Sequence, residues 1–466
     1  MYMKLENNVR TQRRQIHWML LVLIAFCLAH CKEDDVKQEQ EVGYDPSKPV
    51  LVTDFSPKEG GSGTDLVIYG ENFGSDLSKI KVTVGGQIAK VVKVSSNSLY
   101  CIVPMKAYDG DIKVSVLDDN KAELAQAAAK ERLTYIKKFL VSTFLGTKYE
   151  VETDYKEKEG PFDDCGAFKG ILWLTFDPLN HNRLYFSGDK NNARLIDFEN
   201  KYVSIFKTNM TQVSMINWRL DGNRDMIVTD NQGSDTKYGN YIFSRSSNFL
   251  QRDPIPVYAR SVNGTMIHPQ NGELYYSKYY TAEVRRYDFN TKEDKLAFTT
   301  PDSRVSFYMV VHPSGDYAYL IANQKHYIMR TDYDREKKIF KIPYTVCGAS
   351  GTAGYADGVG TAARLSNPVQ GVFVKNPDYE KSGEDDLYDF YFCDATNHAI
   401  RILTPQSRVS TFAGRGNNGT SGYANGDLRL QARFNTPQAI VYDEERSCFY
   451  IGDTGNWVIR KIAKED

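Results

Sequence analysis

The sequence is poor in cysteine and histidine, with seven of each among 466 residues. It contains no Cys-x-x-Cys pair, so it suggests no zinc site. The five cysteines beyond position 31 form an odd and scattered set, which does not make a disulfide framework. Two of these, Cys393 and Cys448, lie in the apolar phrases YFCD and SCFYIGD and are expected to be small buried side chains.

The chain also lacks an excess of charge of either sign, with 58 Lys and Arg against 59 Asp and Glu. Its overall field therefore favours neither nucleic acid nor an acidic polymer, and any selectivity must be local. We expect no nucleic-acid partner.

Sequence motifs of hydrolases are absent, including G-x-S-x-G, H-E-x-x-H and the P-loop. His268 and His312 each precede a proline in equivalent turns, and Asp177 and Asp443 take the matching places elsewhere. One turn role explains all four side chains. The sequence thus predicts no catalytic residue, no metal site and no cofactor.

No apolar run is long enough for a typical spanning helix. The run from Trp18 to Ala29 follows three arginines and is typical of a signal peptide. It ends in LAHC, which resembles the bacterial lipobox, and this resemblance implies that Cys31 is lipidated. The acidic run that follows, KEDD, is similar to the surface-export signal on lipoproteins of glycan-foraging gut bacteria. We therefore expect a signal peptide and lipidation site at 1–31 and a flexible tether at 32–48, in a protein anchored in the outer membrane and facing the cell exterior.

A first folded unit is expected at residues 49–136. Leu66, Ile68, Val82 and Val84 alternate with polar residues, and glycines separate these runs, which is the pattern of a β-sandwich. The phrases FSPKEGG, VIYGENFG and VTVGG, in this order, resemble the IPT/TIG family of immunoglobulin-like domains. The resemblance implies a spacer module.

The remainder, residues 137–466, contains internal repeats. Two segments share GYADG or GYANG, then a proline, then D-x-x-N-x-x-I-R, with Asp394 and Asn397 corresponding to Asp453 and Asn456. The pattern resembles the NHL repeat, a four-stranded propeller blade, and four weaker repeats precede it. We expect an all-β chain in which a six-bladed β-propeller follows the sandwich, and we expect the D-x-x-N residues to hold turns together.

One phrase occurs twice, as VSTFLG at 141–146 and VSTFAG at 409–414. The second copy falls where the outermost strand of the fifth blade is expected. The sixth blade lacks such a strand, because the chain ends soon after Ile462. We therefore predict that the first copy completes the sixth blade and closes the ring.

Aromatic residues are abundant, with 31 Tyr, 23 Phe and 4 Trp. Aromatic faces with hydrogen-bonding groups beside them suit sugars, so the sequence and the resemblance to polysaccharide-uptake lipoproteins favour a surface glycan-binding protein without catalysis. An outer-membrane glycan transporter complex is a further expected partner. Two alternatives stay open: an enzyme acting at the channel mouth, such as a polysaccharide lyase or lactonase-like hydrolase, and an adhesion or protein-interaction scaffold. The candidate ligand-binding residues are Trp173, Trp218, Tyr279, Tyr280, Tyr308 and Trp457.

Overall fold

The computed structural model describes residues 43–148, 158–189, 191–414 and 420–465. The chain divides into two compact units after Lys137. The expected lipidation site Cys31 and the expected signal peptide lie outside the described residues. In the part of the chain that the structure describes, no helix is long and apolar enough to cross a membrane.

The first unit is an immunoglobulin-like sandwich, as predicted. Seven strands pair in the order β1-β3-β6-β5-β4-β7-β8, and the short β2 pairs with β9. The alternating residues Leu66, Ile68, Val82 and Val84 are all fully buried in its core. The strands are β1 (Leu51–Ser56), β2 (Glu59–Gly60), β3 (Asp65–Glu71), β4 (Ile80–Val84), β5 (Gln87–Ser95), β6 (Ser98–Ile102), β7 (Ile112–Leu117), β8 (Glu123–Ala128) and β9 (Thr134–Tyr135).

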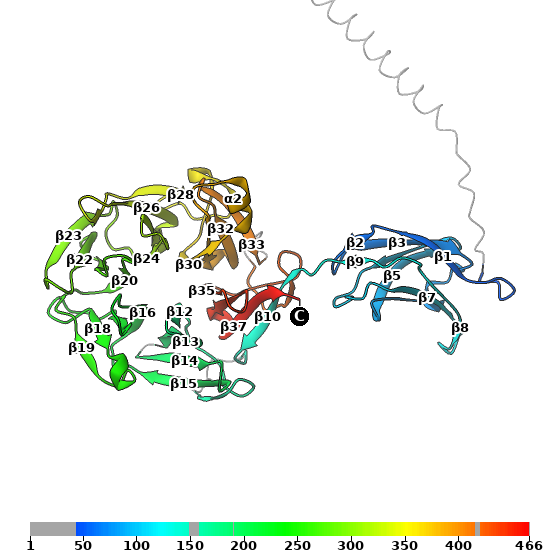
Figure 1. Cartoon of the computed structure of the whole chain (residues 1–466), viewed down its shortest axis with the longest axis horizontal. Coiled ribbons are helices and arrows are strands. Elements are labelled where there is room, and N and C mark those ends of the chain that lie inside the picture. The colour runs from blue at the N-terminus through cyan, green and yellow to red at the C-terminus, as the bar shows by residue number, and fades with distance from the viewer. Residues whose placement is uncertain (1–42, 149–157, 190, 415–419, 466) are drawn as a thin grey trace, which may run out of the picture. The chain divides into compact units, whose positions relative to one another are not determined.

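The second unit is a β-propeller of six antiparallel sheets, which confirms the predicted fold. Figure 1 shows the first strand of each blade, β12, β16, β20, β24, β30 or β35, nearest the centre of the ring. Successive side chains of each inner strand point to opposite faces of the blade, so apolar residues fill the wedges on both sides of it.

In each of the first three blades the strands follow one another in chain order from the channel to the outer edge. They are β12 (Trp173–Asp177), β13 (Asn180–Asp189), β14 (Asn192–Asp197) and β15 (Tyr202–Lys207), with β11 (Gly160–Pro161) at the edge; β16 (Val213–Trp218), β17 (Met226–Asp230), β18 (Asn240–Phe243) and β19 (Arg252–Pro254); and β20 (Val262–Ile267), β21 (Leu274–Lys278), β22 (Glu283–Tyr287) and β23 (Asp294–Thr299).

The last three blades follow the same plan. Their strands are β24 (Phe307–Val311), β25 (Tyr317–Ala322), β26 (Tyr327–Asp334) and β28 (Tyr344–Gly348), with β27 (Ile339–Phe340) beside β26; β30 (Pro368–Lys375), β31 (Tyr388–Asp394), β32 (Ala399–Leu403) and β33 (Arg408–Ala413), with β29 (Gly358–Val359) at the edge; and β35 (Pro437–Asp443), β36 (Cys448–Asp453) and β37 (Val458–Lys464). A short helix, α2 (Pro377–Ser382), joins β30 to β31.

The sixth blade is completed by β10 (Phe139–Leu145), as the repeated phrase predicts. This strand pairs antiparallel with β37 from Phe139 opposite Lys464 to Leu145 opposite Ile459, and β34 (Gly426–Asp427) pairs with its outer edge. The second copy of the phrase contributes to β33, the outer strand of the fifth blade. The ring is thus closed by pairing between its two ends.

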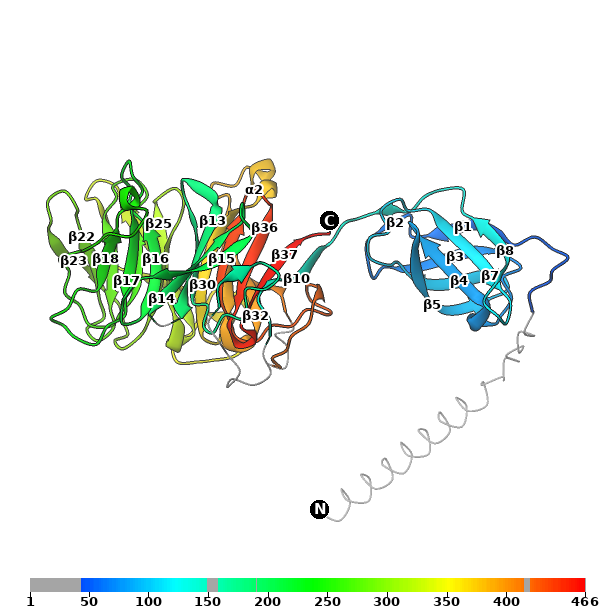
Figure 2. The same cartoon turned by 90° about the horizontal axis from the view of Figure 1, so that it is seen from below.

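The antiparallel strands give the propeller two loop-bearing faces, seen edge-on in Figure 2. One face carries α2 and the turns after each first and third strand, and we name it the α2 face. The other carries the turns after each second strand and the segments that cross from one blade to the next, and we name it the crossover face. The described parts of the crossover face include 231–239, 255–261, 279–282, 300–306, 323–326, 395–398 and 454–457.

The D-x-x-N residues stabilise the turns within their own blades, as expected. Asp394 accepts hydrogen bonds from the Ser366 N–H at 2.7 Å and from Asn397 and Arg401 at 2.8 Å each. Burial raises the pKa of Asp394 to about 6, although Arg401 and Asn397 act against it. The sixth blade repeats the arrangement around Asp453. The carboxylate–arginine pairs are fully buried, so these carboxylates are part of the scaffold.

Candidate functional site

The direction of each strand shows on which face of the propeller each predicted aromatic residue lies. Trp173 begins β12 and pairs with Ser187 near the end of β13, so it lies toward the crossover face. Tyr308 lies in the same way near the start of β24. Trp218 ends β16 opposite Met226, which places it toward the α2 face. The turns with Tyr279, Tyr280 and Trp457 belong to the crossover face, so five of the six residues lie on one side.

Trp173 and Tyr308 meet across the channel. They come from opposite blades, yet their ring centroids are 6.4 Å apart, and Met215 of β16 lies in the same apolar cluster. Their exposed fractions are only 6% and 8%. Burial raises the pKa of Tyr308 to about 12, and no described residue hydrogen bonds to its hydroxyl. The two rings thus lie close together in the channel, and the Tyr308 hydroxyl has no hydrogen-bond partner there among the described residues.

Trp218 and Trp457 are half-buried by packing within the propeller. The Trp218 indole N–H donates to Thr175 Oγ1 at 3.1 Å, and its ring lies 5.3 Å from the Arg245 guanidinium. Trp457 has a left-handed backbone at φ 60°, and its carbonyl accepts from the Phe168 N–H at 2.8 Å. Both residues therefore have structural contacts that hold them in place.

Four tyrosines, of which Tyr258 and Tyr280 are exposed and Tyr238 and Tyr279 half-buried, lie on the crossover face at the second and third blades. The Tyr238 and Tyr258 rings are 4.8 Å apart, and the Tyr258 hydroxyl donates to that of Tyr238 at 3.1 Å. The Arg260 guanidinium lies 4.4 Å from the Tyr280 ring centre, and Tyr279 and Tyr280 are in edge contact at 5.0 Å. We name these five residues the tyrosine–arginine cluster.

The cluster combines open ring faces with polar atoms. Tyr258 and Tyr280 are 50% and 41% exposed, so a face of each ring is accessible. The hydrogen bond from Tyr258 to Tyr238 raises the pKa of Tyr258. The Tyr238 hydroxyl accepts that bond and retains its own proton to donate. The arrangement can stack on an apolar ring face and hydrogen bond at its edge.

Tyr238, Tyr258 and Arg260 were not predicted from the sequence. Two signals could have found them, because Tyr238 stands in the polar turn NQGSDTKYG and Tyr258 just ahead of an inner strand. Both segments lie on the crossover face, so counting aromatics in these segments alone would have selected them. Their mutual contact depends on the isolated bridge between Tyr238 and Tyr258, which no repeat predicts.

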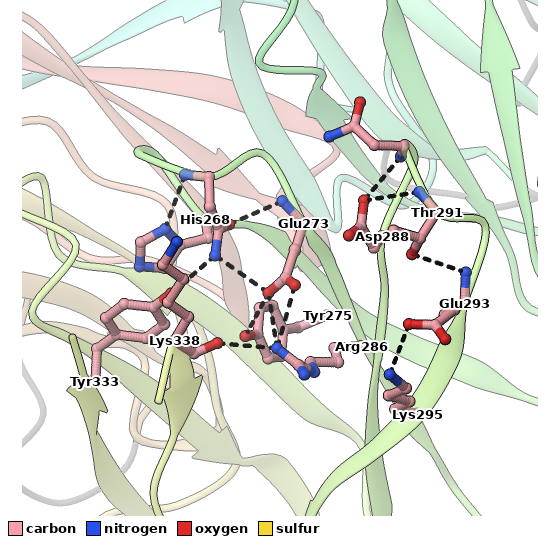
Figure 3. A network of polar contacts seen from close by, with 12 residues as sticks. His268, Glu273, Tyr275, Arg286, Asp288, Thr291, Glu293, Lys295, Tyr333 and Lys338 are labelled. Atoms are coloured by element: carbon pink, nitrogen blue, oxygen red, sulfur yellow. Dashed lines mark hydrogen bonds and ion pairs between the residues drawn. The ribbon is translucent and has the colours of Figure 1, made fainter. Parts of the chain in front are cut away.

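His268 has the predicted turn role on the α2 face. Its Nδ1 accepts from the N–H groups of Gln270 and Asn271 at 3.3 Å each, and its Nε2 lies 3.1 Å from the Gly315 carbonyl. Figure 3 shows the ring beside Tyr333 of the fourth blade, with centroids 4.1 Å apart. All its polar positions are thus engaged within the protein.

The same polar network links the third blade to the fourth through a hydrogen bond from the charged side chain of Arg286. Glu273 accepts from the Tyr275 hydroxyl at 3.0 Å and pairs with Arg286 at 3.2 Å, and Arg286 also donates to the Lys338 carbonyl (Figure 3). His312 occupies the equivalent turn, where its Nδ1 accepts from the Ser314 N–H at 3.2 Å.

The other predicted turn residues follow the same rule. Asp177 and Asp443 accept from the N–H groups of Leu179 and Arg446 at 2.9 and 3.0 Å. One turn role therefore accounts for His268, His312 and both aspartates, as the sequence predicts.

The five cysteines are all buried and free, as expected for Cys393 and Cys448. Burial raises the pKa of Cys101 and of Cys347 to about 12, so neither is a ready nucleophile. Among the described residues, no group of three or more His, Cys, Asp or Glu side chains could hold a metal ion.

Comparison with known proteins identifies the family. The model of the IPT/TIG domain matches residues 49–135. An auxiliary nutrient binding protein from Bacteroides thetaiotaomicron VPI-5482 is 54% identical, covering 91% of this chain and 100% of that one, with a TM-score of 0.86. The chain belongs to its family. A second auxiliary nutrient binding protein, from Bacteroides ovatus ATCC 8483, is 47% identical over 91% of this chain and 100% of that one, with a TM-score of 0.71.

A more distant member of this auxiliary nutrient binding family carries a different name. It also comes from Bacteroides thetaiotaomicron VPI-5482, is 37% identical, covers 91% of this chain and 99% of that one, with a TM-score of 0.83, and bears a provisional phosphatase name. No curated protein matches the chain.

Proposed function

We propose that this protein captures an oligosaccharide or polysaccharide at the tyrosine–arginine cluster and performs no chemistry on it. The observation that carries the proposal is that two exposed rings, Tyr258 and Tyr280, lie on the crossover face, with Arg260 stacked on Tyr280. The nutrient-binding name of relatives at 47–54% identity supports it.

The physical argument is that sugars present two kinds of surface. The C–H face of a pyranose stacks on an aromatic ring, while its hydroxyls hydrogen bond around the rim. Tyr258 and Tyr280 supply exposed rings, and the Tyr238 hydroxyl and the Arg260 guanidinium supply donors. A shallow, exposed site of this kind suits an extended polymer that enters and leaves freely.

We further propose that the protein is a lipoprotein of the outer membrane, anchored through Cys31 and facing the cell exterior. The lipobox resemblance and the acidic run behind Cys31 support this location. An outer-membrane glycan transporter complex is the partner that such a location would serve.

The binding proposal can be tested on the chain from Lys32 onward, which contains both compact units. We expect native gels containing polysaccharides to retard this protein, without release of reducing ends or unsaturated products. Combining Tyr258→Ala with Tyr280→Ala should weaken binding by roughly tenfold or more, because each stacked ring contributes about 0.5–1.5 kcal/mol beyond its buried area.

Tyr202→Ala is the matched control, since Tyr202 is 42% exposed but lies on the outer strand β15 of the first blade. It should bind like the wild type. Equal loss in both variants, or no retardation of the wild type by any glycan, would overturn the proposal and favour a scaffold. Release of products would favour the enzyme alternative.

A further inference from the structure

We infer that the bound glycan is anionic and that Arg260 and Arg304 recognise its carboxylate or sulfate groups. This inference rests on the proposed function and names the class of ligand. It starts from two arginines on successive crossover segments: the Arg260 side chain lies over the exposed ring of Tyr280, and the Arg304 backbone hydrogen bonds to the neighbouring Tyr279.

Arg260 lies over the Tyr280 ring at 4.4 Å, and its side chain is exposed. Its backbone N–H donates to Asp235 Oδ1 at 3.1 Å, but its guanidinium forms no ion pair with any described residue. A guanidinium stacked on a ring keeps its in-plane N–H groups free to meet an anion. Arg260 is therefore a positioned cation whose guanidinium forms no ion pair with a described carboxylate.

Arg304 flanks the same tyrosine pair from the next blade. Its backbone N–H donates to the Tyr279 carbonyl at 2.6 Å, and the residue has a left-handed backbone at φ 59°. Its side chain is exposed, and no ion pair to it occurs in the described ranges. Tyr279 and Tyr280 are thus flanked by Arg260 at the Tyr280 ring and by the backbone of Arg304 at the Tyr279 carbonyl.

Two carboxylates near these arginines, Asp302 and Asp235, accept other hydrogen bonds. Asp302 accepts from the Tyr327 hydroxyl at 2.9 Å and from Ser350 at 3.0 Å. Asp235 accepts from the Arg260 N–H. Neither carboxylate lies within ion-pair distance of Arg260 or Arg304.

The α2 face provides a contrast within the same fold. There Arg245 pairs with Asp177 at 2.7 Å, Arg286 with Glu273 at 3.2 Å, and Arg446 with Asp443 at 2.8 Å. Each of these three arginines has a carboxylate partner. The guanidinium groups of Arg260 and Arg304 form no such pair with a described residue, so they are available to an anion of the ligand.

An anionic sugar can contact both the aromatic rings and a guanidinium group of the cluster at the same time. Its ring stacks on Tyr280 or Tyr258, and a carboxylate or sulfate accepts hydrogen bonds from a guanidinium, whose planar fork fits either group. The chain as a whole is close to neutral, so this selectivity is local.

The test compares matched polymers on the chain from Lys32 onward. Chondroitin sulfate is compared with chemically desulfated chondroitin, and polygalacturonate with its methyl ester, by affinity gels and calorimetry. We expect chondroitin sulfate or polygalacturonate to bind about tenfold or more tightly than its desulfated or methyl-esterified form. The pair that shows the difference distinguishes sulfate from carboxylate recognition.

Arg260→Gln combined with Arg304→Gln should abolish this preference, and the corresponding lysine variants should restore part of it. Arg408→Gln is the control, because Arg408 is exposed on β33 of the fifth blade, away from the cluster. The preference should also shrink as salt rises, since the screening length falls from about 10 Å at 0.1 M to about 3 Å at 1 M.

Three outcomes would overturn this inference, and they differ in what they imply for the proposed function. Tyrosine-dependent binding of neutral glycans alone would overturn the anionic ligand and leave glycan capture standing. Absence of binding to any neutral or anionic polymer would overturn both. An anionic preference that survives the double glutamine variant would overturn the roles of Arg260 and Arg304.

Discussion

At the scale of single residues, His268 shows how a titratable side chain serves as a turn acceptor. Its Nδ1 accepts two backbone N–H groups, so this nitrogen must be unprotonated in the folded protein. Burial lowers the pKa of His268 from 6.5, with a smaller lowering effect of Arg335. The neutral imidazole is therefore the form that the fold stabilises.

This lowered pKa makes stability depend on pH. Between the folded pKa and about 6.5 the unfolded chain binds a proton that the folded chain does not, so stability falls as pH falls. We expect His268→Asn to reduce the slope of the unfolding free energy between pH 7.5 and 5.5, measured by urea unfolding. Asparagine can accept the same bonds without titrating, as Asn376 does at the equivalent turn of the fifth blade.

The slope, rather than the absolute stability, is the informative quantity, because the smaller side chain also leaves a void. His181→Asn is the control, since His181 is exposed. An unchanged slope in His268→Asn would contradict the assignment of a neutral, buried imidazole.

At the scale of elements, β10 determines whether the ring is closed. Val141 and Leu145 of this strand are 1% and 2% exposed and face the core of the sixth blade and its neighbours, whereas Ser142 points to solvent. The strand therefore contributes both hydrogen bonds and buried apolar area.

We expect Val141→Asp to destabilise the propeller by about 3 kcal/mol or more, because it buries an unpaired charge. Calorimetry should show a lower Tm for the propeller and an unchanged transition for the immunoglobulin-like unit, which has its own core. Ser142→Asp places the same charge on the exposed face and should have little effect. A propeller that melts alike in both variants would show that β10 is dispensable.

Sequence reasoning succeeded where elements repeat. The D-x-x-N turns and the duplicated VSTF phrase occur at matching positions of the repeats. Their alignment was therefore enough to predict six blades and the closing strand. The candidate site depends instead on contacts between non-equivalent segments. Trp173 and Tyr308 could be placed on inner strands, but only the ring geometry brings them together across the channel. Arg260 against Tyr280 is likewise a contact between blades that no periodicity encodes.

At the scale of the whole molecule, function depends on where the protein is held. The proposed anchor is Cys31, which follows the apolar run of the signal. A single acyl chain gives marginal attachment, whereas a multiply acylated cysteine holds a protein stably at the membrane.

We expect Cys31→Ala to eliminate fatty-acid labelling and to shift the protein from the membrane fraction to the soluble fraction. Cys27→Ala, within the apolar run, is the control and should remain labelled and membrane-bound. Labelled, membrane-bound Cys31→Ala would refute the lipid anchor. Protection of the wild type from protease added to whole cells would refute display on the outer surface.

The closure by β10 also bears on how the protein assembles. Phe139 pairs with Lys464, so β10, which begins the propeller, can pair only after β37, which ends it, has been synthesised. Such a distant pairing forms slowly, and until then β10 presents an open edge with an apolar face. During that interval the last blade of another copy offers the same partner, so exchange of β10 between two chains is the misassembly that this ring is prone to at high concentration.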